Sequence, residues 1–249
     1  MPVRQDLCGK VLVITLDREK KRNAIDPEMA VGISAALDRL DDDEDIWVGV
    51  ITGGDSVFCA GSDLKDGAQA RTERGGEYGI IRRRRVKPLI AAVEGPALGG
   101  GFEIALACDL IVASTTARFA LPETQRGVVA TSGALFRAIR ALPIHVAKQL
   151  LITQEGLTAE RAFQLGLVSH VTEPGDALRR AQVLADEICR SAPVAVRQTL
   201  AAIASQYEEA DERGWKATAR AITAVKASDD MAEGIAAFFE RRAPQWRGR

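Results

Sequence analysis

The chain alternates between short apolar runs and amphipathic segments over most of its length. Two of the runs, 45–52 and 88–95, are almost continuously apolar, which is typical of strands buried on both faces. Helical patterns separate several of the runs, and this alternation predicts an α/β fold. In chain order, the predicted strands are residues 10–17, 45–52, 88–95, 110–114, 118–121 and 167–171.

The predicted helices carry recognisable end signals. Asp26 is the expected N-cap of a helix with Pro27 at its first position, and apolar side chains then recur at helical spacing. Thr158 predicts the cap of a shorter helix that Gly166 ends. We also expect a helix over about 67–86, between two buried strands.

The last part of the chain is helical from 175 to 240, with a break where Ser191 and Pro193 mark a new start. We therefore expect residues 1–190 to form the α/β core with the functional site. Residues 191–249 are expected to form a helical region that packs on the core or on a neighbouring subunit.

Composition narrows the class of protein. The 249 residues are 47% hydrophobic and 27% charged with a formal charge of −1, as in a soluble globular protein that does not bind nucleic acid. No apolar run approaches the roughly 20 residues of a membrane span, and the start does not resemble a signal peptide. The four scattered cysteines are expected to be reduced core residues of a cytoplasmic protein. The two distant histidines argue against a metal site.

A glycine triplet precedes the first candidate functional residue. In "LGGGFE" (98–103) the helix is expected to begin within the glycines, so its first N–H groups are open to a ligand oxygen. The spacing fits neither a P-loop nor GxGxxG. Glu103 then places a carboxylate in an apolar helix, which is costly unless the group is used. Close packing of the helix on a strand explains the glycines equally well.

A second stretch, "VITGGDSVFCAGSDLKD" (50–66), leaves a buried strand through a glycine-containing turn. An exposed N–H near Ser62 and one from the glycine triplet would together form an oxyanion hole. A serine hydrolase is not indicated, because GxSxG is absent. The run "RRRRVK" (82–87) is expected to form a solvated helix face, with contact to the phosphates of a ligand as the alternative.

Five segments together resemble the enoyl-CoA hydratase/isomerase (crotonase) superfamily, in order and spacing over nearly the whole chain. They are "RNAID" (22–26), "VITGGDSVFCAGSDLKD" (50–66), "KPLIAAVEGPALGGGFEIALACDLIVAS" (87–114), "ARFALPET" (117–124) and "FFERRAPQW" (238–246). The resemblance implies a crotonase-like spiral of repeated ββα units with a C-terminal helical trimerisation region. It also implies a homotrimer or a dimer of trimers.

The resemblance assigns roles to residues at matching positions. The amides of Ser62 and Gly100 would bind the thioester carbonyl of an acyl-CoA. Glu103 and Glu123 match the two acids of the family's hydratases, with Glu103 as the base that activates water and Glu123 as the acid at the α-carbon. The alternative is that both glutamates pair with buried arginines. The implied reaction is reversible hydration of a 2-enoyl-CoA to a 3-hydroxyacyl-CoA, with no metal and no cofactor beyond the CoA of the substrate.

The remaining site residues implied by the resemblance line the groove for CoA. They are Asn23, Ala24, Ser62, Asp63, Leu64, Lys65 and Gly100, mostly through backbone contacts, with Phe239 and Arg242 from the tail of an adjacent subunit.

One segment departs from the family pattern. The family's hydratases usually have "PGxGG" after the second acid, whereas this chain has "GVVATSGALFR" (127–137), so acyl specificity and the placement of water are open. Two alternatives follow from this departure. One is another enzyme of the same fold, a carnitinyl-CoA-type dehydratase or an enoyl-CoA isomerase. The other is a catalytically silent acyl-CoA binder.

Overall fold

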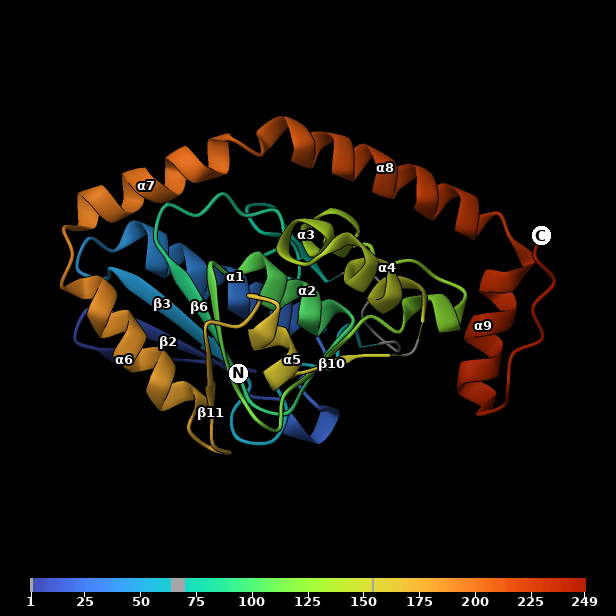
Figure 1. The fold of residues 1–249 in the computed structure, drawn as a ribbon, viewed down its shortest axis with the longest axis horizontal. Coiled ribbons are helices and arrows are strands. Elements are labelled where there is room, and N and C mark those ends of the chain that lie inside the picture. The colour runs from blue at the N-terminus through green and yellow to red at the C-terminus, as the bar shows by residue number, and fades with distance from the viewer. Residues whose placement is uncertain (1, 64–69, 154) are drawn as a thin grey trace.

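The computed structural model describes residues 2–63, 70–153 and 155–249 and has the expected α/β architecture (Figure 1). Its central sheet has the order β1-β2-β3-β6-β8-β11. β1 is antiparallel to β2, and the later strands are all parallel to their neighbours. The strands are β1 (Val3–Cys8), β2 (Val11–Leu16), β3 (Val48–Thr52), β6 (Leu89–Val93), β8 (Leu110–Ser114) and β11 (His170–Thr172).

Helices cover both faces of this sheet, which explains why its middle strands are apolar throughout. All five residues of β3 and of β6 are buried, as the unbroken apolar runs predict. On one face α1 (Pro27–Asp42) contributes Ile33 and Leu37 to the main core. On the other, α6 (Ala177–Cys189) packs Ala181 and two further alanines against β3 and β6.

A smaller sheet lies beside the first and completes the spiral. It contains β7 (Pro96–Leu98), β9 (Arg118–Ala120) and β10 (Leu157–Thr158), in the order β10-β9-β7. β6, β7 and α2 (Gly100–Ala107) form one ββα unit, and β8, β9 and α3 (Ala134–Ala141) form a second. The repeated connection brings the chain from the small sheet into α2, where the glycine triplet lies.

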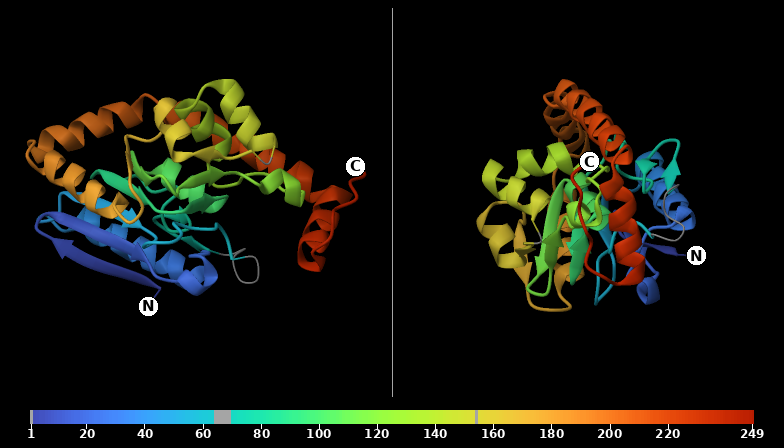
Figure 2. Two further views of the ribbon diagram at one scale, coloured as in Figure 1. Left: turned by 60° about the horizontal axis from the view of Figure 1, so that its bottom comes forward. Right: turned by 90° about the vertical axis from the view of Figure 1, so that its right-hand side faces the viewer.

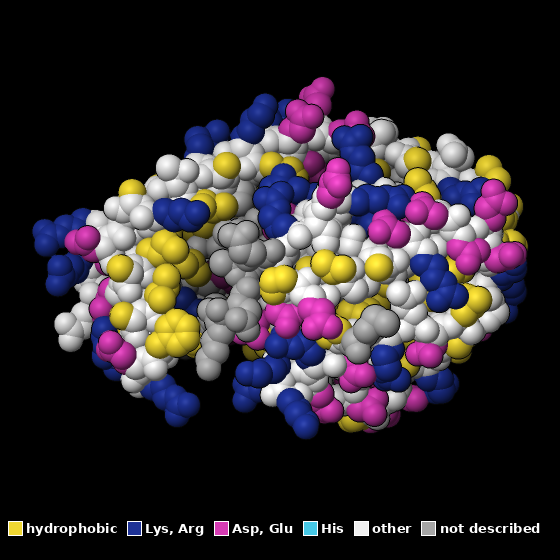
Figure 3. Space-filling view, turned by 180° about the vertical axis from the view of Figure 1, so that it is seen from behind, with side chains coloured by type: hydrophobic (Ala, Val, Ile, Leu, Met, Phe, Trp, Pro, Cys, Tyr) yellow, Lys and Arg dark blue, Asp and Glu magenta, His cyan; other side chains and the backbone are white. Residues whose placement is uncertain are grey.

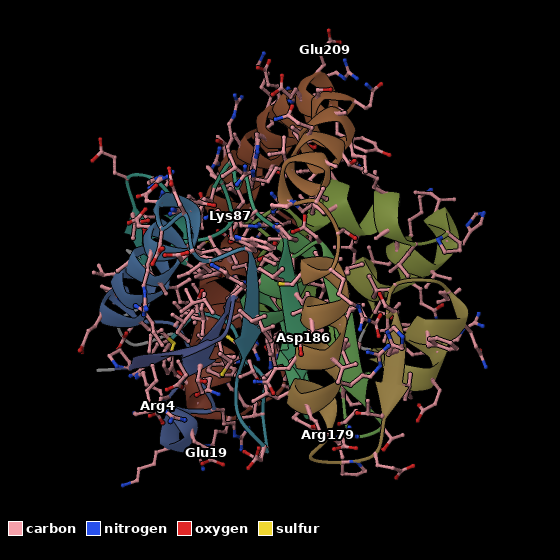
Figure 4. All side chains as sticks on the ribbon, turned by 90° about the vertical axis from the view of Figure 1, so that its left-hand side faces the viewer. Arg4, Glu19, Lys87, Arg179, Asp186 and Glu209 are labelled. Carbon is pink, nitrogen blue, oxygen red and sulfur yellow. The ribbon has the colours of Figure 1, made fainter. Side chains whose placement is uncertain are left out.

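Short helices and the C-terminal helices complete the molecule. The short ones are η1 (Glu19–Lys21), η3 (Glu123–Arg126), α4 (Ile144–Ile152) and α5 (Ala159–Gln164). After α6, the helices α7 (Pro193–Ser205) and α8 (Glu208–Lys226) form an arch over one side of the core, and α9 (Asp229–Glu240) turns back at its far end (Figures 1 and 2). In Figure 4 the labelled Glu209 stands at the top of this arch, near the start of α8. Within the described ranges, no helix is long and apolar enough to cross a bilayer.

The predicted helix ends are confirmed at three places. The Asp26 side chain accepts a hydrogen bond of 2.8 Å from the Met29 amide and caps α1. Thr158 caps α5 in the same way, and α7 begins at Pro193. One cysteine differs from expectation: Cys8 is exposed rather than part of the core.

The helix predicted over about 67–86 is wrong for the part of it that the structure describes. Residues 70–86 contain only the short strands β4 (Arg71–Thr72) and β5 (Gly76–Glu77), followed by turns. Gly76 and Gly79 have φ values of +66° and +76°, which end a helix and favour glycine. A Cβ at Gly79 would lie 2.2 Å from the Ala30 carbonyl oxygen, so this segment packs its backbone directly on α1.

Candidate active site

The glycine triplet lets α2 begin in close contact with two other segments. A Cβ on Gly101 would lie 2.1 Å from the carbonyl oxygen of Cys59. A Cβ on Gly100 would lie 2.5 Å from the hydroxyl oxygen of Tyr78. These glycines therefore allow α2 to pack closely against the two segments. The amide of Gly100, at the N-terminus of α2, has no partner within the helix.

Ser62 is held against α2 by a bridge to the segment before α1. The Ile25 amide donates to Gly61 O (2.8 Å) and the Asp63 amide donates to Ile25 O (2.9 Å). In this parallel arrangement the Ser62 amide points away from Ile25. A Cβ on Gly61 would lie 3.0 Å from the Gly100 nitrogen, so the two segments are in contact.

The amides of Ser62 and Gly100 belong to residues that line one cavity of about 320 Å³. Among the described residues, neither amide donates a hydrogen bond to a protein acceptor. N–H groups that have no protein acceptor among the described residues are available to a ligand or to water. This arrangement suits a ligand oxygen that becomes negatively charged.

Glu103 projects from the first turn of α2 into the same cavity and is 2% exposed. Its Oε1 accepts hydrogen bonds from the amides of Ser132 (2.7 Å) and Ala134 (3.0 Å). Burial, and then the charge of Glu123, raise the pKa of Glu103 to about 7. Two backbone donors on one oxygen stabilise the carboxylate and fix its direction.

Glu123 begins η3 directly after Pro122 and reaches the cavity from the other side of the glycine triplet. A Cβ on Gly99 would lie 3.0 Å from its Oε1, so that glycine also makes room for this side chain. Its Oε2 is buried without a hydrogen-bond partner among the described residues. Burial raises the pKa of Glu123 to about 6.

The two carboxyl groups line one cavity, and the charge of Glu123 contributes to the raised pKa of Glu103. The two backbone donors on Glu103 favour its ionised form, whereas Oε2 of Glu123 has no hydrogen-bond partner among the described residues. Burial outweighs the two donors, so the pKa of Glu103, about 7, stays above that of Glu123, about 6. Within the described chain neither glutamate forms an ion pair, so the alternative that both pair with buried arginines is wrong.

The rest of the cavity wall is mainly apolar. Val128, Val129 and Thr131 come from the segment that departs from the family pattern, and Ile235, Phe238 and Phe239 come from α9. Figure 3 shows hydrophobic side chains gathered at the left-hand end of that view, where α9 lies. Phe238 also carries the Arg126 guanidinium at 4.7 Å from its ring. Such a wall fits an acyl chain.

The residues expected to line the CoA groove fall into separate groups. The Asn23 side chain is fully buried and donates to the carbonyl oxygens of Gly53 (2.8 Å) and Val57 (2.9 Å), so it holds the loop together. Asp63 accepts a hydrogen bond from Arg18, which also donates to the Ala24 carbonyl. Leu64 and Lys65 lie outside the described residues.

The two tail residues differ from each other in position. Phe239 lines the cavity of its own chain, although the sequence placed it in the site of a neighbouring subunit. Arg242 forms ion pairs with Glu233 and Glu240 on and near α9 and does not line the cavity. Its charge is therefore already partnered within this chain.

The run 82–87 does not form the expected solvated helix face. The Arg83 side chain is completely buried and forms ion pairs with Asp41 (2.9 Å) and Asp38 (2.7 Å). Arg85 pairs with Asp109 at 2.9 Å. These arginines link the loop before β6 to α1 and to the residue that follows the C-cap of α2. The expectation of a solvated helix face was wrong because the acidic partners lie far away in the sequence and are not visible in the run itself.

Tyr78 is a cavity residue that the sequence did not indicate. It lies in the segment predicted to be helical, where a single tyrosine between glycines carried no signal. Within the described ranges, no group of three or more His, Cys, Asp or Glu side chains is arranged to hold a metal ion. The polar groups that line the cavity include two carboxyl groups, backbone amides and a phenol.

Comparison with known proteins shows the family to which this chain is related. The model of the enoyl-CoA hydratase/isomerase family matches residues 7–249. Enoyl-CoA hydratase EchA19 of Mycobacterium tuberculosis is 38% identical over 97% of this chain and 94% of that protein. Carnitinyl-CoA dehydratase of Proteus mirabilis is 38% identical over 97% of this chain and 96% of that protein.

A solved structure extends the likeness to the whole fold. The carnitinyl-CoA hydratase from Mycobacterium avium is similar with a TM-score of 0.93 and 38% identity, over 100% of this chain and 99% of that one. The chain belongs to the enoyl-CoA hydratase/isomerase family, and the crotonase-like α/β fold expected from the motifs is confirmed.

Proposed function

We propose that this protein catalyses the reversible syn hydration of a 2-enoyl-CoA thioester to a 3-hydroxyacyl-CoA. The observation that carries the proposal is the meeting of two buried carboxyl groups, Glu103 and Glu123, with the amides of Ser62 and Gly100 in one cavity. Membership of the hydratase/isomerase family supports the CoA-ester substrate. Retention of both acids favours hydration over the isomerase alternative.

The proposed mechanism assigns a separate task to each group. Glu103, as a carboxylate, takes a proton from water while the water oxygen bonds to the β-carbon. The electron pair of the double bond moves onto the thioester oxygen, which the Ser62 and Gly100 amides stabilise as it becomes negative. Glu123, as a carboxylic acid, gives its proton to the α-carbon. The proposed steps need no cofactor beyond the CoA of the substrate.

Dehydration of a 3-hydroxyacyl-CoA is the same chemistry in reverse, and a carnitinyl-CoA-type substrate is the second candidate. The similarity to carnitinyl-CoA proteins and the atypical segment 127–137 favour it. Three residues of that segment line the acyl part of the cavity, so they are placed to select the acyl group.

We also propose that the protein acts as a homotrimer or a dimer of trimers in the cytoplasm. None of the side chains of α7 is buried, and Val194 and Ile203 on it are 59% and 52% exposed. An apolar helix without a covering partner is typical of a subunit interface. The free thiols of all four cysteines fit a reducing compartment. Sedimentation of the purified chain tests the assembly, and a monomer at micromolar concentration would contradict it.

A panel of CoA esters tests the proposed activity. The full-length protein is mixed with crotonyl-CoA, a longer 2-enoyl-CoA, crotonobetainyl-CoA and a 3-enoyl-CoA, and the enoyl thioester absorbance and the products are followed. We expect water to add to at least one 2-enoyl ester. Conversion of the 3-enoyl ester alone would indicate an isomerase. Thermal stabilisation by every ester without turnover would indicate a silent binder.

A further inference from the structure

Tyr78 lies in the candidate active site in a fixed and unusual conformation. It follows β5 with a φ of +57°, a backbone conformation that is uncommon for a bulky residue. Its amide donates to Ala70 O (2.7 Å), and the residue is 6% exposed. A side chain held in this way is often part of a functional site.

The hydroxyl group of Tyr78 lies against Ser62 and Gly100, the two residues whose amides form the proposed oxyanion hole. It makes a hydrogen bond of 2.8 Å with the Ser62 hydroxyl. It also occupies the space in front of the Gly100 Cα, because a Cβ there would lie 2.5 Å from the Tyr78 oxygen. Tyr78, Ser62 and Gly100 all line the same cavity.

The phenol is protonated at neutral pH. Burial, and then the nearby charge of Glu103, raise the pKa of Tyr78 well above its usual range. A neutral phenol is a good hydrogen-bond donor, and in a site shielded from water it stabilises a developing negative charge more than it does in water.

We propose that the Tyr78 hydroxyl is a third hydrogen-bond donor of the oxyanion hole, an inference that rests on the proposed hydration. Either hydroxyl can donate in the contact between Ser62 and Tyr78. In the proposed arrangement Ser62 is the donor, which leaves the Tyr78 proton for the thioester oxygen, together with the Ser62 and Gly100 amides. No proton is transferred by Tyr78. It acts on the charge that forms on the thioester oxygen, and it is a catalytic residue because it contacts that atom.

A purely steric role for Tyr78 makes different predictions. A ring that only closes the wall of the cavity would be replaced by phenylalanine without loss of rate, and it would leave the polarity of the bound carbonyl unchanged. A third donor acts most strongly in the transition state, so its loss lowers kcat more than it changes KM.

The first experiment compares Tyr78→Phe with wild type in crotonyl-CoA hydration. Tyr207→Phe is the matched control, because Tyr207 is the other of the two tyrosines and lies on the surface. We expect Tyr78→Phe to lower kcat by about 10- to 100-fold, with KM within about threefold, since loss of one donor of an oxyanion hole costs up to about 100- to 1,000-fold. Tyr207→Phe should match wild type.

The second experiment measures carbonyl polarisation directly. An aryl-conjugated enoyl-CoA absorbs at longer wavelength when its carbonyl is polarised, so the red shift on binding reports the donors. We expect a smaller shift for Tyr78→Phe. In the Tyr207→Phe background, 3-fluorotyrosine labels Tyr78 alone and makes it a stronger donor, so the shift should increase without any change of shape. This arm remains informative if Tyr78→Phe does not fold.

Three outcomes separate the claims. Unchanged kcat and unchanged red shift in Tyr78→Phe would overturn the third donor while leaving the hydratase proposal intact. An unchanged red shift on fluorination would also overturn it. Failure of the wild-type protein to hydrate any 2-enoyl-CoA would instead reject the proposed function, and with it the catalytic role of Tyr78.

Discussion

The amide of Ser132 donates a hydrogen bond of 2.7 Å to Oε1 of Glu103, 29 residues earlier in the chain. Ser132 belongs to the segment 127–137, in which this chain departs from the family pattern. The backbone of this atypical segment therefore contacts the proposed base. The side chains of Val128, Val129 and Thr131 in the same segment line the cavity.

The paired carboxyl groups predict a narrow pH optimum. The site needs one proton on the pair, and the pKa values are about 6 for Glu123 and about 7 for Glu103. Below this window both groups are protonated and the base is lost, and above it both are ionised and the acid is lost. We expect kcat/KM for crotonyl-CoA to be highest between about pH 6 and 7 and to fall on both sides. A flat profile from pH 5 to 8 would contradict the pairing.

The raised pKa of Glu103 predicts that this buried carboxyl group lowers the free energy of unfolding at alkaline pH. The pKa of Glu103 rises from 4.5 to about 7 on folding, so the folded protein binds more protons and loses stability as pH rises through this range. Glu103→Gln removes this loss, and we expect it to be more stable than wild type by about 1–3 kcal/mol at pH 8 and equal to it at pH 4.

Thermal or urea unfolding at the two pH values measures this difference. Glu44→Gln is the control, because Glu44 is exposed and distant from the cavity, and it should not change stability at either pH. Equal unfolding midpoints for Glu103→Gln and wild type at pH 8 would show that burial of Glu103 costs nothing.

Gly61 is predicted to keep the two proposed donor segments at their spacing. In Gly61→Ala the new Cβ would lie 3.0 Å from the Gly100 nitrogen and 3.0 Å from the Leu98 carbonyl oxygen, at a φ of +91°. We expect kcat to fall at least about tenfold, since the amides no longer converge on one oxygen. Gly166→Ala is the matched control, with a φ of +79° and open space around it. Equal activity of the two variants would show that Gly61 does not set the spacing of the Ser62 and Gly100 amides.

Asn23 is predicted to act on stability rather than on CoA affinity. Its buried amide group donates to three carbonyl oxygens and accepts from the Arg18 amide, and these groups lose their partner in Asn23→Ala. We expect about 2–4 kcal/mol of destabilisation, measured by urea unfolding, with KM for crotonyl-CoA within about threefold. An unchanged unfolding midpoint with a tenfold higher KM would show that the side chain binds CoA directly.

The local features of this fold are readable from the sequence. Asp26 and Thr158 satisfy amides three residues away, so their capping depends only on neighbouring residues. The apolar runs predict the buried strands because burial on both faces requires apolar side chains throughout. The glycine triplet and Glu103 are likewise found from one short stretch.

One missed feature has a local signal: Gly75, Gly76 and Gly79 interrupt the expected helix, because Gly76 and Gly79 adopt positive φ values. The other features that were missed depend on contacts between distant segments. The amides of Ser132 and Ala134 face Glu103 only after α3 has packed beside α2. Tyr78 reaches Ser62 through a turn that the helical pattern concealed. None of these contacts has a local sequence signal.

The central claim is that Glu103 and Glu123 carry the proton transfers of hydration. The most direct measurement is crotonyl-CoA hydration by Glu103→Gln and Glu123→Gln beside wild type, with 3-hydroxybutyryl-CoA binding measured in parallel. We predict that each variant loses at least about 100-fold in kcat while product affinity stays within about threefold. Turnover by Glu103→Gln equal to that of wild type would contradict the account.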